Sequence, residues 1–104
     1  MSDKRAMPMG DEEVLVEDDL REPSMYKVFL LNDDYTTMNF VVSILMDIFH
    51  KTMDEAVRIM QEVHNNGMGL CGVYTAEVAE TKIDLIRSRA RQAGFPLRCT
   101  MEEA

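Results

Sequence analysis

The 104-residue sequence has no tryptophan, only two cysteines, and 11 basic residues against 19 acidic ones. Two cysteines cannot form the disulfide framework of a small secreted domain. The net charge of −8 argues against binding to a phosphate backbone, which needs a basic surface. No apolar run approaches the roughly 18 residues of a membrane span, and none follows a basic start as in a secretory signal. We therefore expect a cytoplasmic protein with no membrane or nucleic-acid partner.

Acidic residues and methionine are plentiful instead. The first 24 residues carry eight acids and three bases, a net charge of −5. Because this stretch has little apolar surface to bury, we predict that residues 1–23 form a disordered acidic extension and residues 24–104 a single folded domain. Its one apolar patch, residues 14–16, could dock on a surface. The ten methionines are typical of irregular cores and of binding surfaces that adapt to several shapes.

Periodicity and capping residues predict three strands and three helices in the folded part. Thr52 and Glu55 form the capping box of the second helix. The order β-α-α-β-α-β predicts an α+β domain in which a three-stranded antiparallel sheet packs against three helices. The predicted elements are a strand at 25–31, a helix from a cap at Thr36 or Thr37 to about residue 50, a helix from Thr52 to Gly67, a strand at 69–74, a helix from Thr75 to Gly94 and a strand at 97–101.

One end of this predicted domain gathers apolar and polar side chains. Only a couple of residues around Lys51 separate the first two helices, so we expect them to be roughly antiparallel, with the start of one near the end of the other. Apolar walls with a few polar groups are typical of a binding site. Taken singly, each side chain is more simply explained as helix core, a solvated turn or a helix-dipole partner, and only their expected convergence at one end indicates a site. The residues expected at this end are Asn32, Asp33, Asp34, Met38, Val41, Met60, Val63 and His64.

The same residues carry a resemblance to a known family. The blocks SMYKV at 24–28, LNDDYT at 31–36, CGV at 71–73 and TAEVAETK at 75–82 resemble, in this order, the Clp protease adaptor ClpS. The similarity covers about residues 23–104, and the family has the element order predicted above. Thr37 stands where the family usually has proline, and Asn39 where it often has glutamate. Both differences affect only how the start of the first helix is fixed.

The resemblance implies an adaptor that hydrolyses nothing. Such a protein recognises substrates by a destabilising N-terminal Leu, Phe, Tyr or Trp and delivers them to the N-terminal domain of a Clp-type AAA+ unfoldase. We expect a monomer that needs no cofactor or metal. The resemblance assigns the substrate α-amino group to Asn32, Asp33, Asp34 and His64, the hydrophobic pocket to Thr36, Met38, Val41, Met60, Val63 and Leu97, and the unfoldase contact to Glu77 and Lys82.

Two other classes of function are compatible with parts of the sequence. Cys71, Cys99, His50 and His64 could serve a thiol or metal enzyme, but there is no C-x-x-C motif and both cysteines fall on predicted strands. Neither a G-x-S-x-G motif nor a glycine-rich phosphate loop is present. The alternative is a docking module like the C-terminal domain of the ribosomal stalk, which has a similar element order but no specificity for N-terminal residues.

Overall fold

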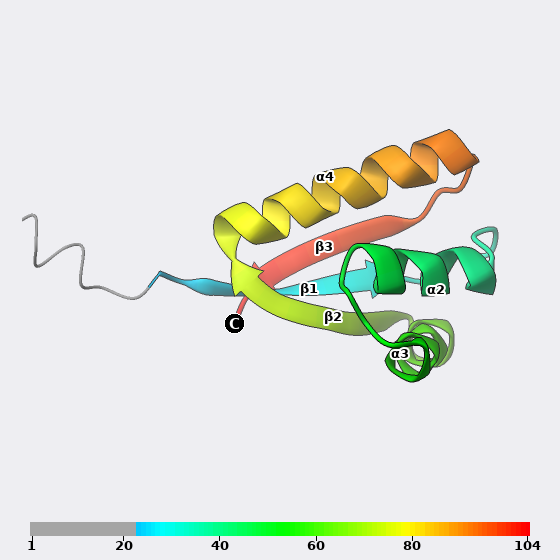
Figure 1. The fold of residues 1–104 in the computed structure, drawn as a ribbon, viewed down its shortest axis with the longest axis horizontal. Helices are drawn as coiled ribbons and strands as arrows, with labels where there is room; N and C mark the ends of the chain where they lie inside the picture. The colour runs from blue at the N-terminus through cyan, green and yellow to red at the C-terminus, as the bar shows by residue number, and fades with distance from the viewer. Residues whose placement is uncertain (1–22) are drawn as a thin grey trace, which may run out of the picture.

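The structure is a computed structural model that describes residues 23–104, so the extension predicted at residues 1–23 lies almost wholly outside the described part. The described chain has the predicted order and fold class (Figure 1). No helix among residues 23–104 is long and apolar enough to cross a membrane. The elements are β1 (Met25–Leu31), α2 (Met38–Asp47), α3 (Met53–Asn66), β2 (Met68–Thr75), α4 (Ala76–Ala93) and β3 (Arg98–Glu103).

The sheet brings three chain segments to one end of the molecule. Its strand order is β2-β1-β3, and both neighbours of β1 are antiparallel to it. Leu31, the last residue of β1, pairs with Met68 on one side and with Arg98 on the other. The loop after β1, the end of α3 and the chain that enters β3 therefore meet at the same end of the sheet.

The capping residues behave as the sequence predicts. Thr37 accepts a hydrogen bond from the Phe40 backbone N–H at the start of α2, and Thr52 with Glu55 forms the capping box of α3. Gly67 ends α3 with a left-handed φ of 90°, which glycine adopts without steric cost. Helix α2 ends at Asp47, about three residues earlier than predicted, and His50 follows with a left-handed φ of 56°.

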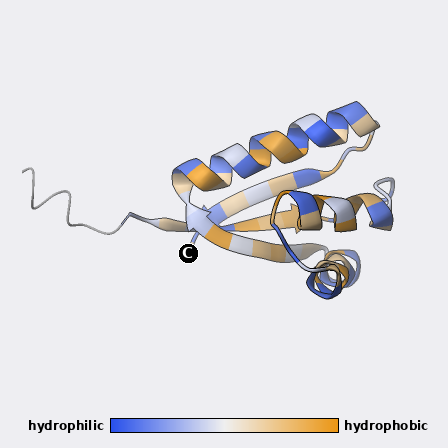
Figure 2. Ribbon diagram, viewed as in Figure 1, coloured by the Kyte–Doolittle hydropathy of each residue, from blue (hydrophilic) through white to orange (hydrophobic). Residues whose placement is uncertain are grey.

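All three helices cover one face of the sheet. That face presents Val28 and Leu30, both fully buried, whereas Leu70 and Val73 on the other face are 41% and 43% exposed. Figure 2 shows apolar and polar residues alternating along α4, as expected of a helix with one buried side. In α3 the buried position predicted for Met60 is occupied by Ile59, and Met60 packs half-buried against the edge of the core.

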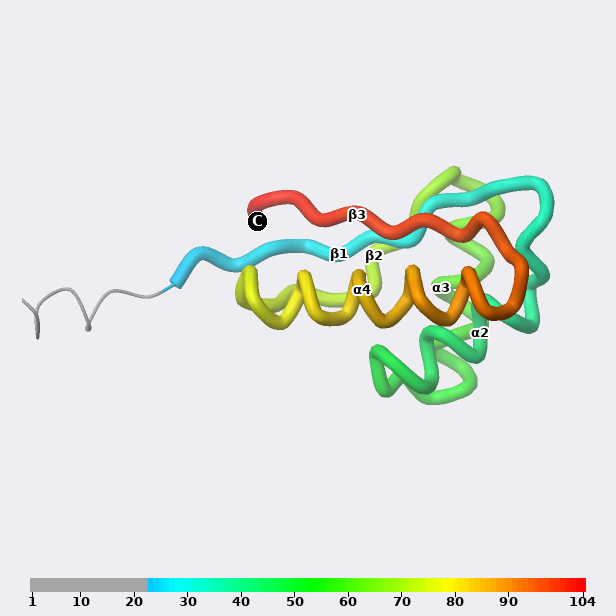
Figure 3. The backbone as a smooth tube through the Cα atoms, turned by 90° about the horizontal axis from the view of Figure 1, so that it is seen from above, coloured from blue at the N-terminus to red at the C-terminus, as the bar shows by residue number. Residues whose placement is uncertain are grey.

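The first two helices are not antiparallel, contrary to the prediction from their short connection. Figure 1 views α3 nearly end-on while α2 lies lengthwise, and Figure 3 shows the same crossing from above. Two features account for the difference. The left-handed His50 turns the chain between the helices, and Gly69 lets α3 approach β2 closely, since a Cβ there would lie 2.7 Å from Val63 Cγ2.

Candidate functional site

The candidate site, defined by the ten residues that the sequence assigns to substrate binding, begins where β1 ends. The Asn32 backbone N–H donates a 2.9 Å hydrogen bond to the Gly67 carbonyl, immediately after α3. This bond and the pairing of Leu31 with Met68 hold the loop of residues 32–37 beside the end of α3. The sequence predicts that these segments lie together, but the structure achieves it through strand pairing and not through antiparallel helices.

Asp33 organises the loop from within. One carboxylate oxygen accepts hydrogen bonds from the backbone N–H groups of Tyr35 (2.8 Å) and Thr36 (2.7 Å), and the other accepts from the Thr36 hydroxyl (2.7 Å). Partial burial opposes the charged form of this carboxyl, but the hydrogen bonds from Thr36 and Tyr35 and the nearby charge of Arg98 outweigh it and lower its pKa. Asp33 therefore keeps its charge while its oxygens are used inside the loop. Asp34, by contrast, is exposed.

The first turn of α2 supplies an exposed methionine above a buried valine. Met38 is the first residue of the helix and is 50% exposed, whereas Val41 is only 6% exposed. Because residues three apart lie on one helical face, the Met38 side chain stands next to Val41. The Phe40 ring packs on the Phe95 ring with centroids 4.9 Å apart, so the start of α2 also contacts the chain that leads into β3.

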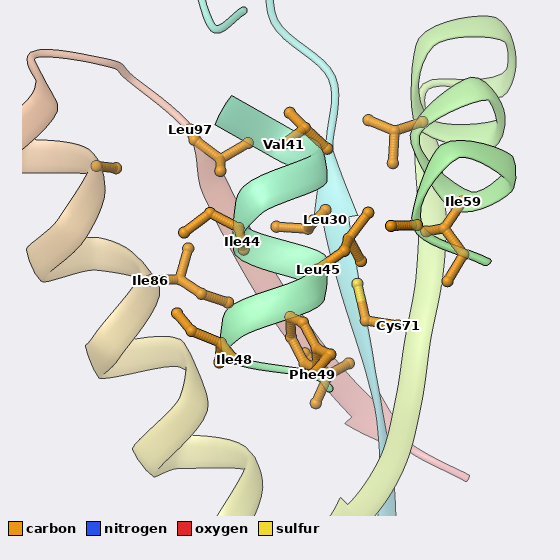
Figure 4. Packing of buried hydrophobic residues seen from close by; sticks show 14 of the residues in the cluster. Leu30, Val41, Ile44, Leu45, Ile48, Phe49, Ile59, Cys71, Ile86 and Leu97 are labelled. Atoms are coloured by element: carbon orange, nitrogen blue, oxygen red, sulfur yellow. The ribbon is translucent and has the colours of Figure 1, made fainter. Parts of the chain in front are cut away.

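The last turns of α3 and the start of β3 complete the apolar part. Val63 is buried in the same core cluster as Val41 and Leu97, and Met60 packs against that cluster. His64, one residue further, is exposed in the last turn of α3. Figure 4 shows Val41 and Leu97 together at the N-terminal end of α2, with Ile48 and Phe49 at its other end.

The ten residues thus fall into three exposure classes at one end of the molecule. The buried members form an apolar base, the half-buried members form its edges, and the exposed members stand at the surface. The buried ones are Val41, Val63 and Leu97; the half-buried ones are Asp33, Thr36 and Met60; the exposed ones are Asn32, Asp34, Met38 and His64.

The two residues assigned to the unfoldase lie on α4 and differ from each other. Glu77, in the first turn, is exposed. Lys82 is half-buried, and its ammonium group donates a 2.7 Å hydrogen bond to the Ile48 carbonyl. The same Nζ lies 5.6 Å from the centre of the Phe49 ring and 5.1 Å from that of Tyr74. The two residues therefore do not present a matched pair of surface charges.

Neither cysteine has the surroundings of a reactive thiol. Burial raises the pKa of Cys71 and of Cys99 to about 12, so both stay protonated at neutral pH. Within residues 23–104 no group of three or more His, Cys, Asp or Glu side chains could hold a metal ion. A cavity of about 400 Å³ lies between α4 and β3; of the ten site residues only Leu97 lines it, with Arg87 and Arg98 among its other residues. The candidate site is therefore a surface of the molecule and not this cavity.

Two residues that support the site were missed by the sequence reasoning. Gly69 has no side chain and so leaves room for Val63 of α3. Arg98, which is distant in sequence from Asp33, stabilises the Asp33 carboxylate by its charge. No local pattern marks such contacts, because they depend on how the strands pair.

A family model described as the ATP-dependent Clp protease adaptor protein ClpS matches residues 21–100. The chain belongs to the ClpS family. A ClpS protein of Nitratidesulfovibrio vulgaris strain Miyazaki F is 64% identical over 99 residues, which cover 93% of this chain and 99% of the relative. A ClpS protein of Oleidesulfovibrio alaskensis is 55% identical over 103 residues, 99% of each chain.

A solved ClpS structure has the same fold. Agrobacterium tumefaciens ClpS2, solved bound to L-phenylalaninamide, superposes with a TM-score of 0.77 and 38% identity over 80% of this chain and the whole of that one. The family resemblance and the fold predicted from the sequence are thereby confirmed. As a ClpS protein, the chain is an adaptor of the ATP-dependent Clp protease.

Proposed function

We propose that this adaptor binds proteins by a free N-terminus that carries Leu, Phe, Tyr or Trp, and that the candidate site holds both the α-amino group and the side chain. The observation that carries the proposal is the hydrogen bond from Asn32 to Gly67. This bond ties the loop of Asn32, Asp33 and Asp34 to the end of α3, close in sequence to His64, and so supports a shared site for these polar groups and the apolar residues at the start of α2. An N-terminal residue presents the complementary pair of groups, an ammonium and an apolar side chain.

The α-amino group is assigned to Asn32, Asp34, Asp33 and His64. An amide oxygen, a carboxylate and the unprotonated nitrogen of an imidazole all accept hydrogen bonds from an ammonium group, and such charge-assisted bonds are strong. Because both oxygens of Asp33 already accept bonds within the loop, we assign it a role through its charge and give the direct contact to Asp34. These bonds require a free amine, so internal peptide segments are excluded.

We assign binding of the substrate side chain to the buried apolar residues Val41, Val63 and Leu97, with Met38 and Met60 beside them. Burial of a Leu or Phe side chain is worth about 1.5–3 kcal/mol. Met38 and Met60 are unbranched and adapt to a branched chain or a ring, and a sulfur–aromatic contact adds about 0.3–1.5 kcal/mol. The phenylalaninamide bound to the ClpS2 relative has both features of the proposed ligand, a free amine and an aromatic side chain. We expect micromolar or tighter binding, about −8 kcal/mol or better.

Delivery uses other parts of the chain. We propose that residues 24–104 are the binding domain, and that Glu77 and Lys82 contact the N-terminal domain of a Clp-type AAA+ unfoldase. The acidic extension of residues 1–23 acts in delivery, and the adaptor works in the cytoplasm without catalysing a reaction itself. Deletion of residues 2–20 is therefore expected to leave peptide binding intact and to slow degradation of a bound substrate.

The deciding experiment compares one peptide with its N-acetylated form. Fluorescence anisotropy should give micromolar or tighter binding for a peptide with a free N-terminal Phe, and at least a hundredfold loss on acetylation. A peptide that begins with Ser and carries Phe internally is the matched control and should not bind. Equal affinity for the free and acetylated peptides would refute the proposal and favour a docking module without N-terminal specificity.

A further inference from the structure

The cavity of about 400 Å³ between α4 and β3 combines apolar walls with two arginines. Figure 1 shows α4 lying along β3, which is an edge strand of the sheet. The volume is within the range of pockets that hold a ligand, about 300–1,000 Å³. We call this cavity the α4–β3 groove; it is lined by Leu31, Ile83, Ile86, Arg87, Leu97, Arg98, Cys99 and Thr100.

Both arginines of the groove can bind a further carboxylate. Arg87 forms a 3.1 Å ion pair with Asp84, but the two side chains are 62% and 73% exposed, so this pair contributes little. A guanidinium group has five N–H donors, which leaves Arg87 able to bind a second carboxylate. Arg98 forms no ion pair with any residue of the described range 23–104. The positive charge of the groove is therefore only partly compensated within that range.

A segment of complementary chemistry lies in the chain before residue 23. Residues 11–19 read DEEVLVEDD, which is three acids, three apolar residues and three acids. The apolar triplet matches the apolar walls of the groove, and the acids on its two sides match the two arginines. Glu102 and Glu103 end β3 and repel such a segment, so the acids are attracted only towards the arginine end of the strand.

The chain is long enough to bring this segment to the groove. It enters the folded part beside the end of β3, where the Ala104 N–H donates a 2.9 Å hydrogen bond to the Met25 carbonyl. The groove residue Thr100 pairs with Phe29, four positions along β1, a distance of about 13 Å at the usual rise of a strand. Val16 is nine positions before Met25, and nine extended residues span up to about 30 Å. Enough length remains for the chain to turn back.

We propose that residues 11–19 dock in the α4–β3 groove of the same chain, with the apolar triplet on its apolar walls and the flanking acids on its two arginines. The docking does not depend on the proposed function. Glu77 and Lys82 do not line the groove, so the proposed unfoldase contact stays uncovered. Of the candidate site only Leu97 lines the groove, and it is 5% exposed, so we expect docking to leave peptide affinity unchanged.

The test attaches a maleimide nitroxide to the full chain through Gly10→Cys, immediately before the segment, and measures the broadening of amide signals by NMR. Burial keeps both native thiols protonated at neutral pH, so the introduced thiol reacts selectively. Docking should broaden the signals of Ile83 and Thr100 several-fold more than those of Leu70 and Val73, which lie on the open face of the sheet.

Three further variants, each carrying the same tag, test the two halves of the complementarity. Leu15→Ser should lower the docking equilibrium constant about tenfold, because the burial of a leucine side chain is lost. Arg87→Gln should lower it about threefold, because an exposed charge pair contributes little. Arg91→Gln is the matched control, an exposed arginine on the same helix that does not line the groove, and it should leave the broadening unchanged.

Four outcomes would overturn the proposal. Broadening confined to residues next to Met25 would show that the segment does not dock, and broadening centred on Leu70 and Val73 would place it on the open face of the sheet. Wild-type broadening in Leu15→Ser would show that the apolar triplet is not what binds. Broadening of an untagged, isotope-labelled chain mixed with tagged, unlabelled chains would show that a second copy supplies the segment.

Discussion

The two ends of helix α2 are built in opposite ways. At its N-terminal end, Met38 is 50% exposed and the helix is held mainly by local bonds, from the Thr37 cap and the Asp33 loop. At its C-terminal end, Ile48 and Phe49 are 7% and 5% exposed, and Lys82 adds a long-range bond. Because its C-terminal end is fixed in the core, this ten-residue helix can expose its N-terminal end as a binding surface while its position in the fold stays the same.

The largest expected effect comes from breaking the closed end. Phe49→Ala should destabilise the fold by about 3–5 kcal/mol, because it leaves a cavity in the core and removes one of the rings beside Lys82. Urea unfolding measures the loss. A loss below about 1 kcal/mol would contradict the idea that this end secures the helix.

Asp33→Ala should weaken the open end by about 2 kcal/mol at pH 7, since three hydrogen bonds to the loop are lost. Because the pKa of Asp33 is lowered in the folded protein, its charged form stabilises the fold above the ordinary carboxyl value of 3.8. That contribution is lost as pH falls through the lower folded value. The wild-type advantage over the variant should therefore be constant above about pH 5 and shrink towards pH 3. A pH-independent difference in urea unfolding would disprove the charge effect.

Removing the imidazole acceptor at the open end should weaken peptide binding about tenfold, an effect of about 1.4 kcal/mol, because one hydrogen bond to the substrate amine is lost. Peptide affinity of His64→Ala measures this loss. The matched control is His50→Asn, where asparagine tolerates the left-handed backbone of the other histidine, and it should bind like the wild-type protein. Unchanged affinity in His64→Ala would remove His64 from the site.

Met38→Ala should change stability least, by under about 0.5 kcal/mol, since half of the side chain is exposed. Its effect should be on choice of substrate. Removing the long side chain makes room for β-branched Ile and Val, whose rigid χ1 prevents adjustment, and a pocket change of this size is worth about 1–3 kcal/mol. Affinities for peptides that begin with Leu, Ile and Val measure the preference, and an unchanged ranking would show that Met38 does not select.

Features that depend on three or four neighbouring residues could be predicted from the sequence. The Thr52–Glu55 capping box and the left-handed Gly67 follow from i, i+3 spacing and from the freedom of glycine, so the ends of α3 were correctly placed. The juxtaposition of Asn32 with the end of α3 was also correct, although the reason given for it, antiparallel helices, was wrong.

Features that depend on packing between distant segments could not be predicted. Periodicity does not decide whether Ile59 or Met60 is the buried residue of α3. Both lie three or four positions from Ala56 and from Val63, but only Ile59 is buried. It is settled by the close approach of α3 to Gly69. Likewise, nothing in the sequence around Lys82 reveals a carbonyl 34 residues away.

The two cysteines have a practical consequence. Since burial raises both thiol pKa values to about 12, both thiols are protonated at pH 7. Alkylating reagents react with the thiolate, so the natural protein is close to inert towards them. A cysteine introduced at the exposed Ser88 would then be modified selectively, which gives a single fluorophore attachment point on α4 with the native residues left in place.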